Sequence, residues 1–306
     1  MSAHTEWRKR GLVFCPSGEV PWMKTHAAVP FAESLGGSLF RIYFSSRDNL
    51  NRSYTGYVVV DIDRPNRILD LSKDPVLGPG GLGEFDDSGA MACWLSFHEG
   101  KKFLYYIGWN LGVTVPFRNS IGLAISTNGN SFDRYSNGPI IDRSAHEPHF
   151  CASCCVYPGK DFWRMWYLSC TGWQMRNGKP EHRYHIKYAE SQDGINWKRE
   201  GLVAIDYLNE REYAISRPSV VQDADRWRMW YSYRGSFYRI GYAESVNGRQ
   251  WKRLDNQAGL DVSPTGWDSE MIEYPFVFDH AGQRYMLYNG NGYGKTGFGL
   301  AVLTDG

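Results

Sequence analysis

Acidic side chains stand at the ends of several short apolar segments of this sequence. The acids that could act together are Asp87, Glu147, Glu212 and Glu273. Cleavage of a glycosidic bond needs two carboxyl groups across the anomeric carbon, one protonated and one ionised. A third acid can hold the first at the pKa that it needs. These residues are therefore the candidate catalytic groups, and we favour Asp87, Glu273 and one of Glu212 and Glu147.

Three of these acids also have a structural interpretation. Asp87 and Asp268 hold matching places, in "GEFDDS" and "GWDSE", and could cap the turn before the next strand. Glu273 could be a buried acid paired with Arg217, and Glu147 could be a loop acid paired with Arg143. These alternatives predict ion pairs or caps instead of a shared reaction site.

Basic and aromatic residues at the same segment ends could bind a ligand. The candidates are His26, Arg47, Trp109, His149, Trp173 and Arg217. The basic side chains suit sugar hydroxyls or an anionic group such as phosphate or carboxylate, and the tryptophans could stack on a sugar face. The alternative is that they form salt bridges between repeated units or pack at the periphery.

The segments that would position these residues are repeated. The run "IKYAESQDGINWKRE" at 186–200 returns as "IGYAESVNGRQWKRL" at 240–254. Related runs begin at Thr55, Ile121 and Phe298, and each copy follows a second apolar-aromatic run such as "FLYYIG" or "WRMWYL". A third strand-like run precedes these, as in "HAAVPFA", "CASCCVYP" and "EYPFVFD". The length and composition of all these runs predict β-strands, and no long helical period is present.

Three copies of the repeat continue into a turn and an aromatic residue. They read "STNGNSF", "SQDGINW" and "SVNGRQW", at 126–132, 191–197 and 245–251. Asn-Gly and Asp-Gly are typical of type I′ hairpin turns, in which both central residues have positive φ. We expect the aromatic residue to begin the next strand and to pack over the turn.

Five units of about four strands each are how β-propellers are built. A lone sheet would leave an apolar face and bare edges, whereas blades in a ring bury the faces and protect the edges. The sequence therefore predicts an all-β fold, a five-bladed β-propeller with four-stranded antiparallel blades, as a single domain over 1–306. The alternative is a two-sheet sandwich.

Composition limits the classes of partner and the location. The 306 residues carry a formal net charge of +1, which argues against binding to nucleic acid or a membrane surface through bulk charge. There is no apolar stretch of membrane-spanning length and no export signal at the N-terminus, so we expect a cytoplasmic protein with reduced thiols. The cluster "HFCASCC" could be a metal site, but we favour small residues packed on a crowded strand and expect no metal there.

The repeated hairpins carry a resemblance to a known superfamily. A five-bladed pattern with "S-x-D-G-x-x-W" hairpins resembles the furanosidase-type glycoside hydrolases, which include the family 43 arabinanases and xylosidases, the family 32 fructosidases and the family 130 mannoside phosphorylases. The resemblance covers nearly the whole chain. It allows an axial calcium ion, although nothing in the sequence requires a cofactor. The six-bladed sialidases, whose Asp-box hairpin is one residue longer, are a weaker match.

The sequence departs from the catalytic pattern that this resemblance implies. Family 43 enzymes place an Asp beside the Pro of the first inner strand, where this chain reads "HAAVP", with His26 and no carboxylate. They carry a Glu on the third inner strand, where this chain reads "CASCC" and the nearest acid is Glu147. A "Glu-x-Pro" pattern occurs instead on the fifth unit, at Glu273. These departures indicate a distant member or a changed reaction.

Two functions are consistent with these residues and motifs. The first is a carbohydrate-active enzyme that hydrolyses, phosphorolyses or transfers a glycosyl group, with a small carbohydrate or an activated sugar as its ligand. The surplus of acids at the strand ends favours it. The second is a non-catalytic sugar-binding or interaction propeller, which the missing first-strand Asp favours.

Overall fold

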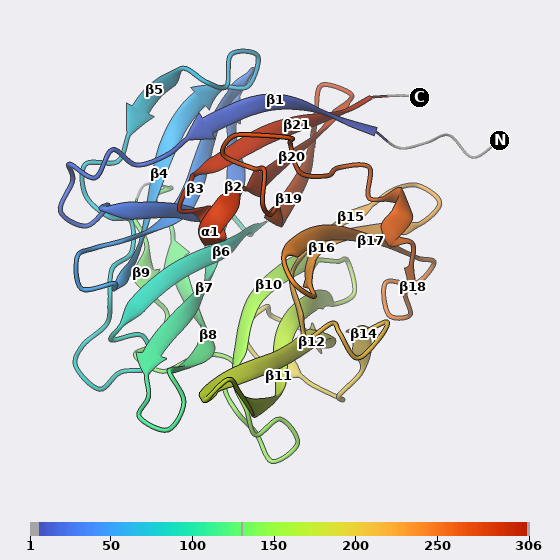
Figure 1. The fold of residues 1–306 in the computed structure, drawn as a ribbon. Helices are drawn as coiled ribbons and strands as arrows, with labels where there is room; N and C mark the ends of the chain where they lie inside the picture. Colours follow the sequence, from blue (N-terminus) through green and yellow to red (C-terminus); the bar gives the residue numbers. More distant parts are fainter. Residues whose placement is uncertain (1–5, 130, 305–306) are drawn as a thin grey trace.

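The computed structural model describes residues 6–129 and 131–304, and this part of the protein is almost entirely β-structure (Figure 1). Its helices are two short turns, η1 (Asp255–Gln257) and α1 (Asn291–Gly294). The all-β class and the low helix content are confirmed. No helix of the described residues is long and apolar enough to cross a membrane.

Hydrogen bonds join the described strands into three sheets. The first contains β2 (Thr25–Gly36), β3 (Leu39–Arg47), β4 (Ser53–Asp61), β5 (Ile68–Leu71), β6 (Gly89–His98), β7 (Lys101–Leu111), β8 (Phe117–Ser126) and β9 (Asp133–Arg134). The second contains β10 (Cys151–Pro158), β11 (Trp163–Arg176), β12 (Lys179–Ser191), β13 (Trp197–Lys198), β14 (Val203–Ile205), β15 (Ala214–Gln222), β16 (Trp227–Arg234), β17 (Tyr238–Ser245) and β18 (Lys252–Arg253). The third contains β1 (Glu6–Phe14), β19 (Glu273–His280), β20 (Gln283–Asn289) and β21 (Phe298–Thr304).

Each large sheet divides into two antiparallel strand groups at a single parallel bridge. Ser53 faces Gly89 between β4 and β6, and Tyr184 faces Ala214 between β12 and β15. The strand groups are therefore β2–β5, β6–β9, β10–β14, β15–β18, and β19–β21 with β1. In the last group, β1 pairs antiparallel with β21, so the N-terminal strand completes a sheet of the C-terminal segment (Figure 1).

The first strands of the groups meet at the centre of the molecule. Contacts join β2 to β6, β6 to β10, β10 to β15, β15 to β19, and β19 back to β2. The count of five blades stays a prediction, because the hydrogen-bonded sheets of the described residues number three and none of them is closed.

Four of the second strands carry a tyrosine at the same place in the repeat, and each faces a buried or half-buried acid. The tyrosines are Tyr106, Tyr167, Tyr231 and Tyr288, and their partners in that order are Asp86, Glu147, Asp255 and Asp268. A cation then reaches each acid. The pairs are Arg134–Asp86 (2.9 Å), Arg199–Glu147 (2.7 Å), Arg253–Asp255 (2.5 Å) and Lys9–Asp268 (2.7 Å). The three arginines follow the aromatic residue of the repeated hairpin by two positions, so the repeat encodes the cation in three of these groups. In the fourth group, Lys9 of β1 provides the cation.

The glycine of the repeated "I-G-x-A" run leaves room for this contact. A Cβ atom at Gly241 would lie 2.5 Å from the Tyr231 ring and 2.7 Å from Asp255 Oδ1. In β12 a lysine replaces the glycine, and the Nζ atom of Lys187 lies 3.1 Å from a Glu147 carboxylate oxygen. The glycine at Gly241 therefore makes room for the tyrosine ring and the acid, whereas Lys187 contacts the acid itself.

We expect Gly241→Ala to lower the free energy of unfolding by about 1–3 kcal/mol, because an added methyl group in a filled core forces its neighbours to move. Urea denaturation measures the change. The matched control is Gly138→Ala, since a Cβ atom at Gly138 meets nothing within 4 Å. Equal stability of the two variants would contradict the proposed packing role.

The repeated hairpins form, but not as type I′ turns. Gly194 and Gly248 each have a φ of 72°, whereas the Asp or Asn before them has no positive φ. The side chains stabilise the turn instead: Ser191 Oγ accepts a hydrogen bond from Gly194 N–H (3.0 Å), and Asp193 Oδ1 accepts two backbone N–H groups (2.8 Å each). Trp197 begins β13 and donates from Nε1 to the Gly194 carbonyl (3.2 Å), as expected.

Candidate functional site

Three of the innermost strands have an unusual backbone where they approach the centre. In each, the residue before a proline has a positive φ; these residues are Val29 (55°), Arg217 (51°) and Tyr274 (55°). Each lies at a β-bulge, where a proline without an N–H group is tolerated. The N–H groups are held by side chains of other strands: Asn289 for Val29 (2.8 Å), Ser153 for Arg217 (3.3 Å) and Ser232 for Tyr274 (2.7 Å). Strained backbone of this kind is concentrated at functional sites.

A cavity of about 290 Å³ opens beside these bulges. Its wall includes residues from every strand group, namely Ala28, Val29, Arg47, Met91, Ile107, Trp109, Phe117, Asn119, Phe150, Ala152, Ser153, Leu168, His182, Tyr184, Ser216, Arg217, Arg234, Tyr238, Tyr274 and Tyr293. The volume is at the small end of the range of about 300–1,000 Å³ for ligand pockets. Its mixture of aromatic rings and a few polar groups is typical of a site for a small ligand.

Three of the predicted binding residues line this cavity: Arg47, Trp109 and Arg217. The first two occupy the same position relative to the second strand of their groups, as does Arg234, which also lines the cavity. Arg217 is completely buried and donates to the carbonyl oxygens of Cys93 and, at 3.1 Å, Pro30. It has no carboxylate partner among the described residues, so the predicted pairing with Glu273 is wrong.

The other three predicted binding residues lie outside the cavity wall. His26 is half-buried beside Arg47 and Lys295, and burial together with these charges lowers its pKa to about 4. His149 is half-buried next to Gly172. Trp173 packs on Phe117, with ring centroids 5.5 Å apart, and lines a larger outer hollow instead.

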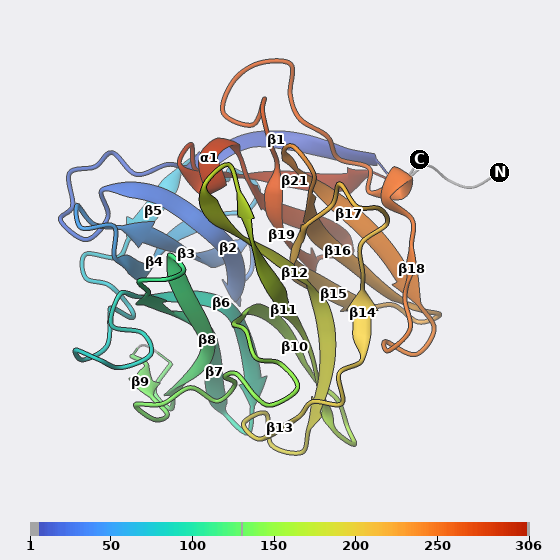
Figure 2. The same cartoon turned by 60° about the horizontal axis from the view of Figure 1, so that its bottom comes forward.

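The outer hollow has a volume of about 1270 Å³ and shares Phe117 and His182 with the inner cavity. The long hairpin formed by β11 and β12 provides most of its wall, including Trp173 (Figure 2). The two spaces are therefore adjacent, with a narrow, largely apolar inner part and a wider, more polar outer part.

Glu273 begins β19 directly behind the cavity wall. It is completely buried, and neither carboxyl oxygen makes a hydrogen bond of normal geometry within the described residues. Burial raises the pKa of Glu273 well above its ordinary value, and the charge of Arg234 and the backbone N–H of Tyr293 oppose this only in part. Its electrostatic neighbours Tyr184, Tyr238 and Tyr274 all line the cavity. The raised pKa therefore favours the neutral form of Glu273, directly behind the cavity wall.

Glu147 lies outside the cavity, in the tyrosine–acid–cation contact of its group. Its carboxylate accepts a hydrogen bond from Ser169 Oγ (2.8 Å) and pairs with Lys187 and Arg199, not with Arg143. Burial alone would raise its pKa, but the Ser169 hydrogen bond and the lysine charge hold the pKa below its usual value. Glu147 is therefore an ionised, fully engaged carboxylate.

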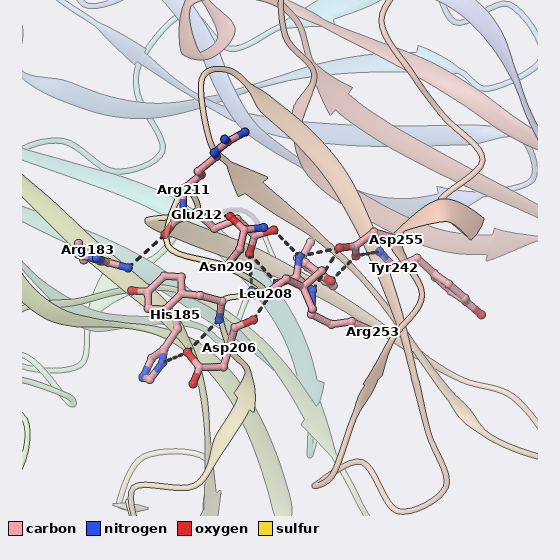
Figure 3. Close-up of polar contacts among 12 residues, drawn as sticks. Arg183, His185, Asp206, Leu208, Asn209, Arg211, Glu212, Tyr242, Arg253 and Asp255 are labelled. Carbon is pink, nitrogen blue, oxygen red and sulfur yellow. Dashed lines mark hydrogen bonds and ion pairs between the residues drawn. The ribbon is translucent and has the colours of Figure 1, made fainter.

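Glu212, like Glu147, is a carboxylate held by an arginine (Figure 3). Its two carboxylate oxygens accept a fork of hydrogen bonds from Arg253 (2.8 and 3.1 Å), and one of them also accepts the Leu208 N–H (2.9 Å). Asp87 is half-buried and accepts hydrogen bonds from Ser88 Oγ (2.9 Å) and Asn110 Nδ2 (3.0 Å). Neither Glu212 nor Asp87 is part of the cavity wall.

The prediction that Asp87 and Asp268 occupy equivalent positions in their strand groups is wrong. Asp268 is buried and contacts Tyr288 and Lys9, whereas the residue with the same kind of environment in the second group is Asp86, beside Tyr106 and Arg134. Adjacent acids in "FDDS" cannot be told apart by sequence, because which one turns inward depends on the loop.

The sequence prediction missed three cavity residues that precede the repeated apolar run of the third strands. Asn119, Tyr184 and Tyr238 each stand two residues before the repeated apolar run, and all three line the cavity. The hydroxyl groups of Tyr184 and Tyr238 hydrogen-bond to each other. Extending the repeat two residues toward the N-terminus would have found this position.

The cysteine cluster forms no metal site within the described residues, where no group of three or more His, Cys, Asp or Glu side chains is placed to hold an ion. All six cysteines are free, and the Cys93 and Cys154 sulfur atoms lie 3.8 Å apart. Calcium prefers oxygen ligands. The centre instead holds the Arg217 guanidinium beside these thiols, so the residues do not fit an axial calcium ion.

Comparison with known proteins places this protein in a family. No family model matches it. The uncharacterized protein Rv1502 of Mycobacterium tuberculosis is 48% identical over 299 residues, which cover 98% of this chain and 99% of that protein. This protein belongs to the Rv1502 family.

Solved structures show which fold this family has. A thermostable family-43 glycoside hydrolase matches with a TM-score of 0.66 and 16% identity over 93% of this chain and 90% of that one. A glycosyl hydrolase from Bacteroides ovatus matches with a TM-score of 0.72 and 15% identity over 98% and 93%, and BT0996, solved as an RGII complex, with a TM-score of 0.72 and 17% identity over 98% and 92%. The suspected resemblance to the furanosidase-type glycoside hydrolases is confirmed for the fold of this Rv1502-family protein, in place of a two-sheet sandwich.

Proposed function

We propose that this protein is a carbohydrate-active enzyme that cleaves or transfers a glycosyl group in the cavity at the axis of a five-bladed ring, with Glu273 as its general acid. The observation that carries the proposal is the neutral, unpaired carboxyl group of Glu273 beside the cavity. A leaving sugar oxygen must be protonated as its bond breaks, and an acid with a raised pKa keeps its proton at neutral pH for that purpose. The volume of the cavity favours a small carbohydrate or an activated sugar.

The residues of the cavity wall favour transfer of the glycosyl group to an acceptor that does not need a base to deprotonate it. No Asp or Glu side chain is part of the wall among the described residues, and Glu273 lies directly behind it, so no carboxyl group besides Glu273 is available there as a base. An anionic acceptor such as phosphate is already a nucleophile and needs no base. Trp109 and Phe117, whose ring centroids lie 4.7 Å apart, offer an apolar face for a sugar ring.

The experiment is a screen of aryl glycosides and nucleotide sugars, each with and without phosphate. We expect turnover of at least one small glycoside, with a rate that rises when phosphate is present. Product analysis by mass spectrometry separates a free sugar from a sugar phosphate. If no compound of the panel turns over while one of them binds, the enzyme proposal fails.

A non-catalytic sugar-binding protein is the second candidate. It is favoured by the ion pairs of Glu147 and Glu212, which engage two of the four candidate acids outside the cavity. Calorimetric titration of the same panel tests it. Binding of a sugar with no turnover under any condition is the result expected for this function.

A further inference from the structure

Three arginines of the cavity wall have no carboxylate partner within the described residues. Arg47 Nη1 donates to Asn51 Oδ1 (3.2 Å), and Arg234 Nη1 donates to the Tyr293 hydroxyl (2.7 Å). The guanidinium of Arg217 donates to backbone carbonyl oxygens. Outside the cavity a buried guanidinium is held differently, since Arg253 forms ion pairs with both Glu212 and Asp255.

Two of these arginines also keep an unused donor. The Nε atoms of Arg217 and Arg234 are buried and have no hydrogen-bond partner among the described residues. Burying a charge is costly unless the charge is paired, and a guanidinium has five N–H donors to satisfy. Arg217 is completely buried, so the missing partner must enter the protein to reach it.

The titratable groups beside these arginines do not neutralise their charge. Burial raises the pKa of Glu273 and so favours its neutral form. Burial and the charge of Arg234 lower the pKa of His182 in the wall to about 4, so His182 is also neutral at pH 7. The wall of the cavity therefore carries net positive charge, although the whole protein is close to neutral at +1.

We propose that the cavity is an oxyanion site in which Arg47, Arg217 and Arg234 bind a phosphate or carboxylate group. The sugar part of the ligand rests on the proposed function. The binding of an anion does not, because it is inferred from the arginines alone. The anion is either a group of the sugar itself or free phosphate that acts as acceptor. Arginine suits both, because its planar fork pairs with two oxygen atoms at once.

Calorimetric titrations with inorganic phosphate, glucuronate, glucose 6-phosphate and glucose test the site. Wild-type protein is expected to bind at least one of the anions and to bind it at least about tenfold more tightly than glucose. Arg47→Gln and Arg234→Gln should each weaken anion binding about tenfold or more, because each removes a charged donor. Arg64→Gln is the matched control and should not change it, because Arg64 is exposed and lies outside the cavity wall.

The titrations also distinguish the two sources of the anion. Tight binding of phosphate alone assigns the site to the acceptor, whereas binding of an acidic sugar but not of phosphate assigns it to the substrate. Equal binding of glucose and the anions, or equal weakening in Arg64→Gln, would overturn the proposal. Repeating the titrations with Glu273→Gln keeps this test separate from catalysis, because the oxyanion site predicts unchanged anion binding in an inactive protein.

Discussion

Glu273→Gln is expected to lower kcat/KM for the glycoside found in the screen by about 10²–10⁴-fold, the usual contribution of a general acid. The amide keeps the shape of the neutral carboxyl group but has no proton to transfer. The loss should be smaller for aryl glycosides with a good leaving group, which need less protonation. Initial rates with a series of aryl leaving groups measure both effects. Full activity of Glu273→Gln, or an equal loss for all leaving groups, would exclude Glu273 as the general acid.

The same substitution has a signature in stability that does not depend on activity. Burial raises the folded-state pKa of Glu273 above its unfolded value of about 4.3. The stability that the neutral carboxyl contributes is therefore fully present below that value and is lost as the pH rises through the folded pKa. Relative to wild type, Glu273→Gln should become more stable as the pH rises, by up to about 1.4 kcal/mol per pH unit. Urea denaturation between about pH 5 and 9 measures this slope, and parallel curves would contradict the neutral state.

Glu212→Gln is expected to lower the free energy of unfolding by about 1.5–3 kcal/mol, because it removes one of the two carboxylates that pair with the buried Arg253, while Asp255 stays in place. The contact lies well inside the fold, with 7% of the Glu212 side chain and 8% of the Arg253 side chain exposed (Figure 3). Urea denaturation measures the change.

The triple variant Glu212→Gln, Arg253→Met and Asp255→Asn is the control for this prediction. It removes all three charges of the contact and should recover part of the lost stability, since replacing a whole buried ion-pair group is far less costly than breaking it. A loss of turnover in Glu212→Gln without a loss of stability would contradict the structural role and would return Glu212 to the candidate catalytic acids.

The repeated strands were predictable from the sequence, because each strand depends on local patterns that recur along the chain. The run from Ile240 and its equivalents became third strands, and Trp197 packs on its turn as expected. The predicted turn type was wrong because side-chain hydrogen bonds stabilise the turn. The Asp193 side chain accepts two backbone N–H groups.

The site was harder to predict, because it depends on which side chains turn toward the centre. Arg47, Trp109 and Arg217 were expected at the cavity and line it. The ion pairs of Glu147 and Glu212 join residues that are 52 and 41 positions apart, and no local pattern indicates them. Extra residues at bulges also reverse the alternation of side chains, as between Ala152 and Cys154, so a strand's inward face cannot be counted from one end.

The pairing of β1 with β21 has a consequence for how this protein folds. The register joins Trp7 to Leu303 and Phe14 to Phe298, so segments at opposite ends of the described residues must find each other. Pairing between strands so far apart in sequence slows folding. Until β1 has paired with it, β21 exposes an unpaired strand edge to other molecules. During synthesis this pairing can form only after Phe298–Thr304 has left the ribosome. Bulky fusions close to Trp7 would hinder that last step.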